Sequence, residues 1–408
     1  MAISTPHPAT NGAPRTSVGA FEGLPQHVQD FVRKPGRLLI DGEWVEAASG
    51  KTFETLNPAT EESLGRVALG APEDIELAVA AARRCFDDER SDWRRMTPSE
   101  RGKVIHRIGD LIARHADELA ALEAGLPAGV VNIVTGFGDA GAALAAHDGV
   151  DKVAFTGSTE VGRLIVQAAV GNLKKVTLEL GGKSPQVLYK DADMDVAIPG
   201  AANGIFFNQG QCCNAGSRLY VERDVYDEVV QGISDEAKKI KVGPGLDPDT
   251  QMGPLISAEQ HDKVLGYLSS GLDAGASAPA GGGRAGDRGY FVQPTVLTDT
   301  TPDMKVVREE IFGPVVCAIP FGSEDDDVIR SGNDTNFGLA SGIWTRDINK
   351  AHRTANRLRA GTVWINCYSV FDAAMPFGGY KESGWGREMG HNALENYLET
   401  KSVVTQLA

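Results

Sequence analysis

Two adjacent cysteines, Cys212 and Cys213, are the side chains of this sequence best suited to nucleophilic chemistry. They lie in the polar, glycine-containing stretch 208–218, which follows the apolar run 204–207. Such a loop or helix start can expose a thiol beside backbone amides, and we expect these amides to lower the thiol pKa from about 8.5 and to bind an oxyanion. The alternative is that both thiols are small buried side chains that fill the core.

Glu179 is the second candidate for chemistry. It ends an apolar strand candidate that begins at Val176, and the glycines Gly181 and Gly182 follow closely. Because α/β sheets place their sites at the carboxyl ends of strands, this carboxylate is a candidate general base. The alternative is a surface glutamate or one held in a salt bridge.

The five cysteines of the chain are Cys85, Cys212, Cys213, Cys317 and Cys367. Their odd number and scattered positions do not fit a disulfide framework in a chain of this size, so we expect free thiols. No CxxC or HxxxH spacing near the cysteine pair indicates a metal site, and we expect no metal ion. A reactive cysteine here would therefore act as a thiolate.

A glycine-rich turn at 136–141 reads Gly-Phe-Gly-Asp-Ala-Gly and follows the β-branched strand candidate 130–134. It matches the GxGxxG pattern of Rossmann folds, and the acidic Glu160 lies about twenty residues further on, as in those folds. The alternative is that these glycines only serve a turn and close helix packing.

A second unit of strand, turn and helix follows directly. Its strand candidate is 150–155, its turn is 156–162, and its helix runs through Ile165 and Ala169. Ser158 can cap this helix, and the amides of residues 157–159 would face a bound anion.

The elements that position these groups alternate between strands and helices. An Asp-Gly turn predicts a hairpin over 38–45, and the spacing of apolar residues predicts one helix from Pro72 and a second from the 97–100 region to Leu122. This alternation predicts a largely parallel α/β fold. Further strand candidates are 176–182, 187–189, 219–221, 315–319, 342–345 and 361–366.

Length and charge limit the classes of function. A chain of 408 residues exceeds what one hydrophobic core usually serves, so we expect two domains after a poorly ordered arm at 1–35. A net charge of −15 argues against nucleic-acid binding, which needs clustered lysine and arginine. No apolar run is long enough to span a membrane and the N-terminus lacks a signal-peptide core, so we expect a cytoplasmic protein.

Three stretches together resemble the aldehyde dehydrogenase superfamily. They are Phe-Thr-Gly-Ser at 155–158, Leu-Glu-Leu-Gly-Gly at 178–182 and Gly-Gln-Cys-Cys at 210–213. The resemblance covers nearly everything from Leu38 to the C-terminus. The other matching stretches are 309–314, 336–339 and 376–384.

In that superfamily the second cysteine of the pair attacks an aldehyde carbonyl, which assigns the nucleophile to Cys213. The resemblance implies a thiohemiacetal, hydride transfer to a nicotinamide cofactor, and hydrolysis of a thioester with Glu179 as general base. The expected cofactor is NAD, with NADP as the alternative, and it would lie along the 156–162 turn rather than the 136–141 turn. The residues that match cofactor-binding positions are Gly157, Ser158, Val161, Gly162, Leu180, Glu310 and Phe312.

Three phenylalanines, Phe207, Phe371 and Phe377, match positions that line the aldehyde tunnel of the family. The stretches 366–374 and 384–388 are most similar to phenylacetaldehyde dehydrogenases, and aromatic walls would suit an arylacetaldehyde. The alternative is that these rings are plain core residues.

One internal segment of the family has no counterpart in this sequence, because the chain passes from the helix ending near Glu123 directly to residues 125–127. In relatives the segment holds an oligomerisation hairpin, the first strand of the cofactor sheet and a Lys-Pro-Ala-Glu motif that binds the adenosine ribose. It also holds a Pro-Trp-Asn-Phe-Pro motif whose asparagine donates to the oxyanion. Losing one such donor costs about 3 kcal/mol, although the Cys213 amide could still contribute.

The resemblance implies an aldehyde dehydrogenase-like α/β fold with an incomplete parallel-sheet cofactor domain at 36–181 and an α/β catalytic domain at 182–384. A helix at 385–398 would return to the cofactor domain, and 399–408 would form an oligomerisation strand. We expect a homo-oligomer, a dimer or tetramer, weakened by the loss of the hairpin.

Three functions follow as alternatives. The first is NAD(P)-dependent oxidation of an aldehyde. The second is a catalytically impaired chain that assembles with intact subunits through its C-terminal strand. The third is cofactor-free thioester hydrolysis by Cys213 and Glu179.

Overall fold

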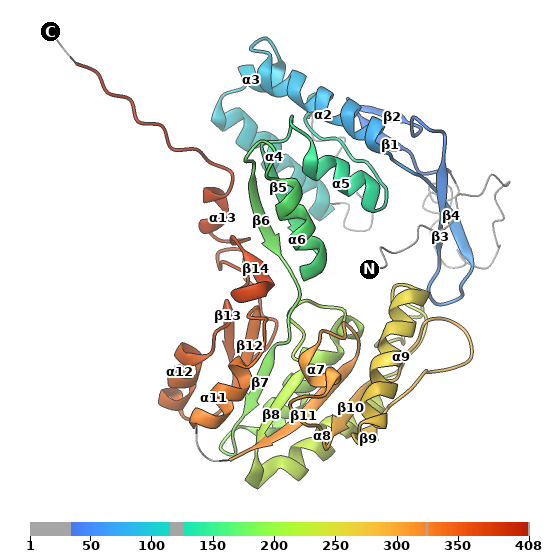
Figure 1. Ribbon diagram of the computed structural model, residues 1–408, viewed down its shortest axis with the longest axis vertical. Coiled ribbons are helices and arrows are strands. Elements are labelled where there is room, and N and C mark those ends of the chain that lie inside the picture. The colour runs from blue at the N-terminus through green and yellow to red at the C-terminus, as the bar shows by residue number, and fades with distance from the viewer. Residues whose placement is uncertain (1–33, 115–125, 323–324, 407–408) are drawn as a thin grey trace. The chain divides into compact units, whose positions relative to one another are not determined.

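The computed structural model describes residues 34–114, 126–322 and 325–406, and the chain divides into two compact units (Figure 1). None of the helices in these described ranges is both long and apolar enough to cross a membrane. The first unit comprises residues 1–57, 62–153 and 167–174, and the second comprises residues 58–61, 154–166 and 175–408.

The first unit contains two antiparallel strand pairs. Strand β1 (Leu38–Ile40) pairs with β2 (Glu43–Val45), and β3 (Thr52–Leu56) pairs with β4 (Ser63–Ala68). The turn between β1 and β2 has positive φ at Asp41 (54°) and Gly42 (78°), the backbone of a tight hairpin turn that an Asp-Gly pair favours. The predicted hairpin is therefore confirmed.

Two helices of the first unit, α2 and α4, begin where the sequence predicts. Helix α2 starts at Pro72, whose missing N–H needs no partner there, and the Asp74 carboxylate accepts from the Ala71 N–H at 2.9 Å. The predicted extension of the second helix to Leu122 lies outside the described residues. The helices are α2 (Pro72–Asp87), α3 (Asp92–Arg95), α4 (Pro98–Arg114) and α5 (Gly138–Ala146).

The strand predicted over 130–134 is wrong. Its β-branched residues favour an extended chain, but within the described residues only Leu39 pairs with it. Leu39 and Ile133 exchange two backbone hydrogen bonds of 3.0 and 2.8 Å, and Val130 belongs to a turn that bonds back to Pro127. A β-branched run without a neighbouring strand along its length thus forms one bridge and no more.

The second unit is built on a seven-stranded sheet of order β13-β12-β7-β8-β11-β10-β9. All neighbouring strands are parallel except β9 and β10. The central strands are buried on both faces, which explains why they appear in the sequence as continuous apolar runs. The strands are β7 (Pro185–Leu188), β8 (Arg218–Glu222), β9 (Ser277–Ala280), β10 (Thr295–Thr298), β11 (Val315–Phe321), β12 (Ala340–Trp344) and β13 (Thr362–Ile365).

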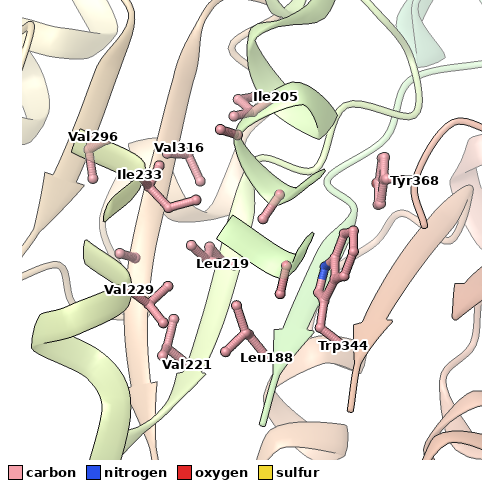
Figure 2. Close-up of a cluster of buried hydrophobic side chains, with 14 of the residues drawn as sticks. Leu188, Ile205, Leu219, Val221, Val229, Ile233, Val296, Val316, Trp344 and Tyr368 are labelled. Atoms are coloured by element: carbon pink, nitrogen blue, oxygen red, sulfur yellow. The ribbon is translucent and has the colours of Figure 1, made fainter. Parts of the chain in front are cut away.

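Helices cover both faces of this sheet. Successive residues of a strand point to opposite faces, so Leu219 and Val221 of β8 enter one apolar cluster and Tyr220 enters another. Figure 2 shows the first cluster, to which α7 contributes Ile205 and α8 contributes Ile233. The predicted α/β architecture is confirmed. The helices are α7 (Met194–Phe206), α8 (Tyr226–Lys239), α9 (Ala258–Asp273), α10 (Lys305–Arg308), α11 (Asp325–Asn333) and α12 (Ile348–Arg357).

A smaller sheet has the order β14-β6-β5, with β5 (Lys152–Thr156), β6 (Lys175–Glu179) and β14 (Gly384–Trp385). Helix α6 (Thr159–Ala168) follows β5, and most of α6 groups with the second unit. The compact units therefore differ from the domain boundary expected at 181/182.

The C-terminal region contains less regular structure than its expected roles suggest. The segment 385–398 contains the four-residue helix α13 (Asn392–Glu395), and residues 399–406 have no strand partner in the described chain. An oligomerisation strand over 399–408 stays a prediction.

Candidate active site

The cysteine loop lies at the amino end of β8. After α7 ends, Asn208, Gln209 and Gly210 have positive φ values of 49°, 57° and 65°, which turn the chain tightly before the cysteines. A Cβ added to Gly210 would overlap the backbone carbonyl of Gly313, the residue just before β11. Because β8 and β11 are parallel neighbours, these two loops meet at the same edge of the sheet.

Cys213 is partly buried, and its electrostatics differ from the expectation. Burial, with smaller contributions from Cys212, Glu179 and Glu310, raises the pKa of its thiol to about 11. The N–H of Asn214 lowers the pKa but is outweighed. A backbone amide therefore lowers this pKa as expected, but the expected net decrease is wrong, because burial and the carboxylates around the loop outweigh the amide.

Glu179 ends β6, at the carboxyl end of a strand as predicted, and is only 5% exposed. Burial and, to a smaller extent, the charge of Glu388 raise its pKa to about 8, and Arg387 opposes the increase. Within the described residues its Oε2 atom is buried without a hydrogen-bond partner. A Cβ at Gly378 would lie 2.7 Å from Oε1, so this glycine leaves room for the carboxylate. Glu179 is thus not the surface residue of the alternative interpretation.

Two glycines join Glu310 to the cysteine loop. The Gly182 N–H donates to Glu310 Oε1 at 2.9 Å, and a Cβ on Gly182 would overlap the Cys213 carbonyl. A Cβ on Gly181 would overlap the Glu310 carboxylate. Burial raises the pKa of Glu310, and the Gly182 N–H counteracts it. Glu310 and Cys213 therefore lie on either side of one glycine peptide that follows Glu179.

Phe312 has a left-handed backbone, with a φ of 57°. Gln260 on α9 holds this turn, because its Nε2 donates to the Phe312 carbonyl at 2.7 Å and to the Ile311 carbonyl at 3.0 Å. A small cavity here is lined by Gly182, Glu310, Phe312 and Cys212, among others.

The turn before α6 packs on the strand that carries Glu179. The Gly157 N–H donates to the Glu179 carbonyl at 3.0 Å, and the Ser158 hydroxyl accepts from the Val161 N–H at 3.2 Å, as predicted for a capping residue. A Cβ on Gly162 would lie 2.8 Å from both terminal carbons of Leu180. Val161 is 41% exposed, so its side chain is accessible beside the helix start.

Two of the three predicted tunnel residues lie together. The rings of Phe371 and Phe377 meet edge to face with centroids 5.4 Å apart. Trp364 adds to the cluster at 5.6 Å from Phe371 and 4.8 Å from Tyr368. Phe207 is 61% exposed at the end of α7.

Gly182, Gln260, Asn214 and Tyr368 were missed by the sequence reasoning. Gly182 lies within a motif already singled out, so close approach could have been anticipated there. Gln260 carries no local signal, since it lies on an ordinary amphipathic helix fifty or so residues away from the turn it holds.

In the described parts of the chain, no three His, Cys, Asp or Glu side chains are grouped closely enough to hold a metal ion.

Comparison with known proteins connects this geometry to a family. The profile of the aldehyde dehydrogenase family matches residues 44–124 and 120–403. An aldehyde dehydrogenase of Aspergillus niger is 41% identical over 475 residues, covering 91% of this chain and 95% of the relative. The mitochondrial benzaldehyde dehydrogenase of Antirrhinum majus is 41% identical over 477 residues, covering 91% of this chain and 89% of the relative.

A solved structure agrees in three dimensions. The NAD+ complex structure of aldehyde dehydrogenase from Bacillus cereus has a TM-score of 0.90 to this chain at 40% sequence identity, and it covers 93% of this chain and 98% of that one. The profile match, the identity along nearly the whole length and the shared fold leave one conclusion: the chain belongs to the aldehyde dehydrogenase family.

Proposed function

We propose that this chain oxidises an aldehyde to a carboxylic acid with NAD+ or NADP+, through a thiohemiacetal and a thioester on Cys213. The observation that carries the proposal is the arrangement around Gly182, three residues after Glu179, which contacts the Cys213 backbone carbonyl and donates its N–H to the Glu310 carboxylate. Glu179 contributes a buried oxygen that has no hydrogen-bond partner among the described residues, which leaves it free to accept a proton as a general base does.

The first step is attack by the Cys213 sulfur on the carbonyl carbon. The thiol proton passes to water as the carbon–sulfur bond forms, the carbonyl π bond breaks, and the carbonyl oxygen becomes the oxyanion of a thiohemiacetal. Since burial holds the Cys213 pKa near 11, the thiolate is a minor species at neutral pH. The nucleophile is therefore generated mainly as the substrate binds and reacts.

The residues present fit a nicotinamide dinucleotide. Glu310 is a buried carboxylate with one oxygen bonded to Gly182, and the amides at the start of α6 suit a pyrophosphate. Glu310 and Phe312 would hold the ribose and nicotinamide, and Gly157, Ser158 and Val161 would hold the pyrophosphate and adenine. NAD+, when bound, supplies the hydride acceptor that converts the thiohemiacetal to a thioester. The NAD+ complex of the Bacillus cereus relative supports this choice of cofactor.

The last step is hydrolysis of the thioester. Glu179 takes a proton from the attacking water, the acyl carbon–sulfur bond breaks, and Cys213 leaves as the thiolate while the carboxylic acid is released. A glutamate with a pKa near 8 is a stronger base than an exposed one, once it is deprotonated. The step should therefore be slow below pH 8 and approach a plateau above it.

We further infer that an internal segment of the relatives is absent from this chain. The family profile matches in two pieces that meet at residues 120–124, and the alignments run over 475 and 477 residues although the chain has 408. The absent segment would include the asparagine oxyanion donor, whose loss typically reduces the rate about a hundredfold or more. We propose a weakened enzyme rather than an inactive assembly partner.

The cluster of Trp364, Tyr368, Phe371 and Phe377 supports an arylacetaldehyde such as phenylacetaldehyde as substrate. The name of the Antirrhinum majus relative, a benzaldehyde dehydrogenase, is consistent with the broader class of aromatic aldehydes. We propose that the enzyme acts in the cytoplasm as a homo-oligomer.

The test is NADH production by the purified chain with phenylacetaldehyde and NAD+. We expect slow, steady turnover that Cys213→Ala abolishes and the matched control Cys212→Ala retains. Absence of turnover in the unmodified chain, or equal loss in both cysteine variants, would reject the proposal.

A further inference from the structure

Tyr368 binds the residue that directly follows the cysteine nucleophile. Its hydroxyl donates to the backbone carbonyl of Asn214 at 2.7 Å, and the whole contact is buried. The neighbouring Ser369 accepts a hydrogen bond of 2.8 Å from the Asn214 side-chain amide. Asn214 is therefore held by two consecutive residues of the loop after β13, through its backbone and its side chain.

The tyrosine ring is itself fixed. A Cβ on Gly204 of α7 would lie 3.0 Å from one edge of the ring, and a Cβ on Gly342 of β12 would lie 2.6 Å from the other. The ring also packs on Trp364, with centroids 4.8 Å apart, and Figure 2 shows it at the border of the apolar cluster beside Trp344. Only glycines at these two positions leave space for the ring, so the hydroxyl has little freedom to turn away from Asn214.

The peptide between Cys213 and Asn214 is constrained at both ends. Its carbonyl is packed against Gly182, and its N–H lowers the pKa of the Cys213 thiol, so it favours the thiolate. Rotation of the Asn214 backbone would move this N–H relative to the sulfur. Among the interactions of the Cys213 sulfur, the Asn214 N–H favours the thiolate, whereas burial and the neighbouring carboxylates oppose it.

We propose that Tyr368 is a positioning residue for the nucleophile: by fixing the Asn214 carbonyl, its hydroxyl holds the backbone that directly follows Cys213 and so keeps the thiol and its neighbouring peptide in place. Ser369 supports this arrangement through the Asn214 side chain. The inference rests on the proposed role of Cys213, but it concerns the reactivity of the thiol and does not require that any aldehyde be oxidised.

The test measures the rate of Cys213 alkylation by iodoacetamide across pH, on the full chain in a Cys212→Ala background, with the modified residue identified by mass spectrometry. Tyr368→Phe keeps the ring and removes the hydroxyl. The matched control is Tyr226→Phe on α8, whose hydroxyl donates to the Ala318 carbonyl at 3.1 Å. We expect Tyr368→Phe to shift the profile to higher pH and to slow alkylation near pH 8 roughly fivefold, the effect of one hydrogen bond.

A profile of Tyr368→Phe that coincides with the parent, or an equal shift in Tyr226→Phe, would overturn the proposal. If Tyr368→Phe does not fold, the alkylation profile of Ser369→Ala is measured instead. We expect a smaller shift to higher pH, and an unchanged profile would contradict the proposal. A chain that oxidises no aldehyde but shows the expected alkylation shift would reject the proposed function and leave the positioning role intact.

Discussion

At the scale of single residues, the two candidate catalytic groups are both shifted toward their neutral forms. The pKa of Cys213 is raised to about 11 and that of Glu179 to about 8, mainly by burial; the charge of Glu179 adds to the increase at Cys213, and the charge of Glu388 adds to that at Glu179. At neutral pH the site thus holds few charges, which limits electrostatic repulsion before a substrate enters. The positive groups that could reverse this are few, Arg387 beside Glu179 being one.

The raised pKa of Glu179 makes stability dependent on pH. The pKa of this carboxyl is near 8 in the folded protein and 4.5 in the unfolded chain. Its contribution to the free energy of unfolding is therefore complete below pH 4.5 and is lost as the pH rises through 8. Glu179→Gln removes the charge, so its melting temperature should exceed that of the parent by more at about pH 9 than at about pH 5. The same variant should reduce steady-state turnover about a hundredfold, as expected for loss of a general base.

Differential scanning calorimetry at the two pH values, together with NADH production, checks both effects. Glu382→Gln is the matched control, since Glu382 is an exposed glutamate in a surface salt bridge with Arg163. A melting-temperature difference that does not change with pH would contradict the buried, protonated state of Glu179.

The identities of these residues could be predicted from the sequence, but their ionisation could not. Glu179 at a strand end and Cys213 in a glycine-containing loop are local features, and the family resemblance assigns their roles. Their pKa values depend on Glu310 and Glu388, which approach from distant parts of the chain. Tyr368 was missed for the same reason, because its contact with Asn214 joins residues 154 positions apart.

At the scale of elements, the connection between β6 and β7 holds the site together. It leaves the small sheet after Glu179 and enters the large sheet at Pro185, and its glycines allow Cys213 and Glu310 to approach. The central strands were predictable because burial on both faces produces continuous apolar runs. The 130–134 run has the same composition but lacks neighbours, which a sequence pattern does not reveal.

Gly182→Ala should therefore destabilise the fold. The added Cβ meets the Cys213 backbone, which cannot move as a flexible side chain could, and overpacking of this kind costs about 1–3 kcal/mol. Gly266→Ala on α9 is the control, because no atom lies within 4 Å of the added Cβ and alanine favours a helix. Urea unfolding should show a lower midpoint for the first variant and an unchanged or higher one for the second; equal midpoints would refute the close approach.

At the scale of the whole molecule, the C-terminal tail exposes apolar side chains. Val403 is 80% exposed and Val404 is 93% exposed, and in Figure 1 the tail extends beyond α13 without a strand beside it. Adjacent exposed valines on an extended segment are typical of a strand that pairs with another chain. This supports the expected role of residues 399–408 in assembly.

Removal of residues 399–408 should convert the proposed homo-oligomer to monomers, as measured by light scattering after size-exclusion chromatography. The paired substitutions Val403→Asp and Val404→Asp should do the same, because a charge in a strand interface is costly to bury. Lys401→Asp, a charge change on the same tail, serves as the control. A full-length chain that is already monomeric, or a truncated chain that stays oligomeric, would exclude this role for the tail.

The contact between Gly210 and Gly313 bears on how such an enzyme could be re-engineered by recombination. The turn before the cysteines and the turn after Phe312 touch backbone to backbone, with no side chain between them to absorb a mismatch. A chimera that takes one of these turns from a relative and keeps the other would have to reproduce the same separation. The two turns should therefore be exchanged as a single block, although about a hundred residues lie between them in the sequence.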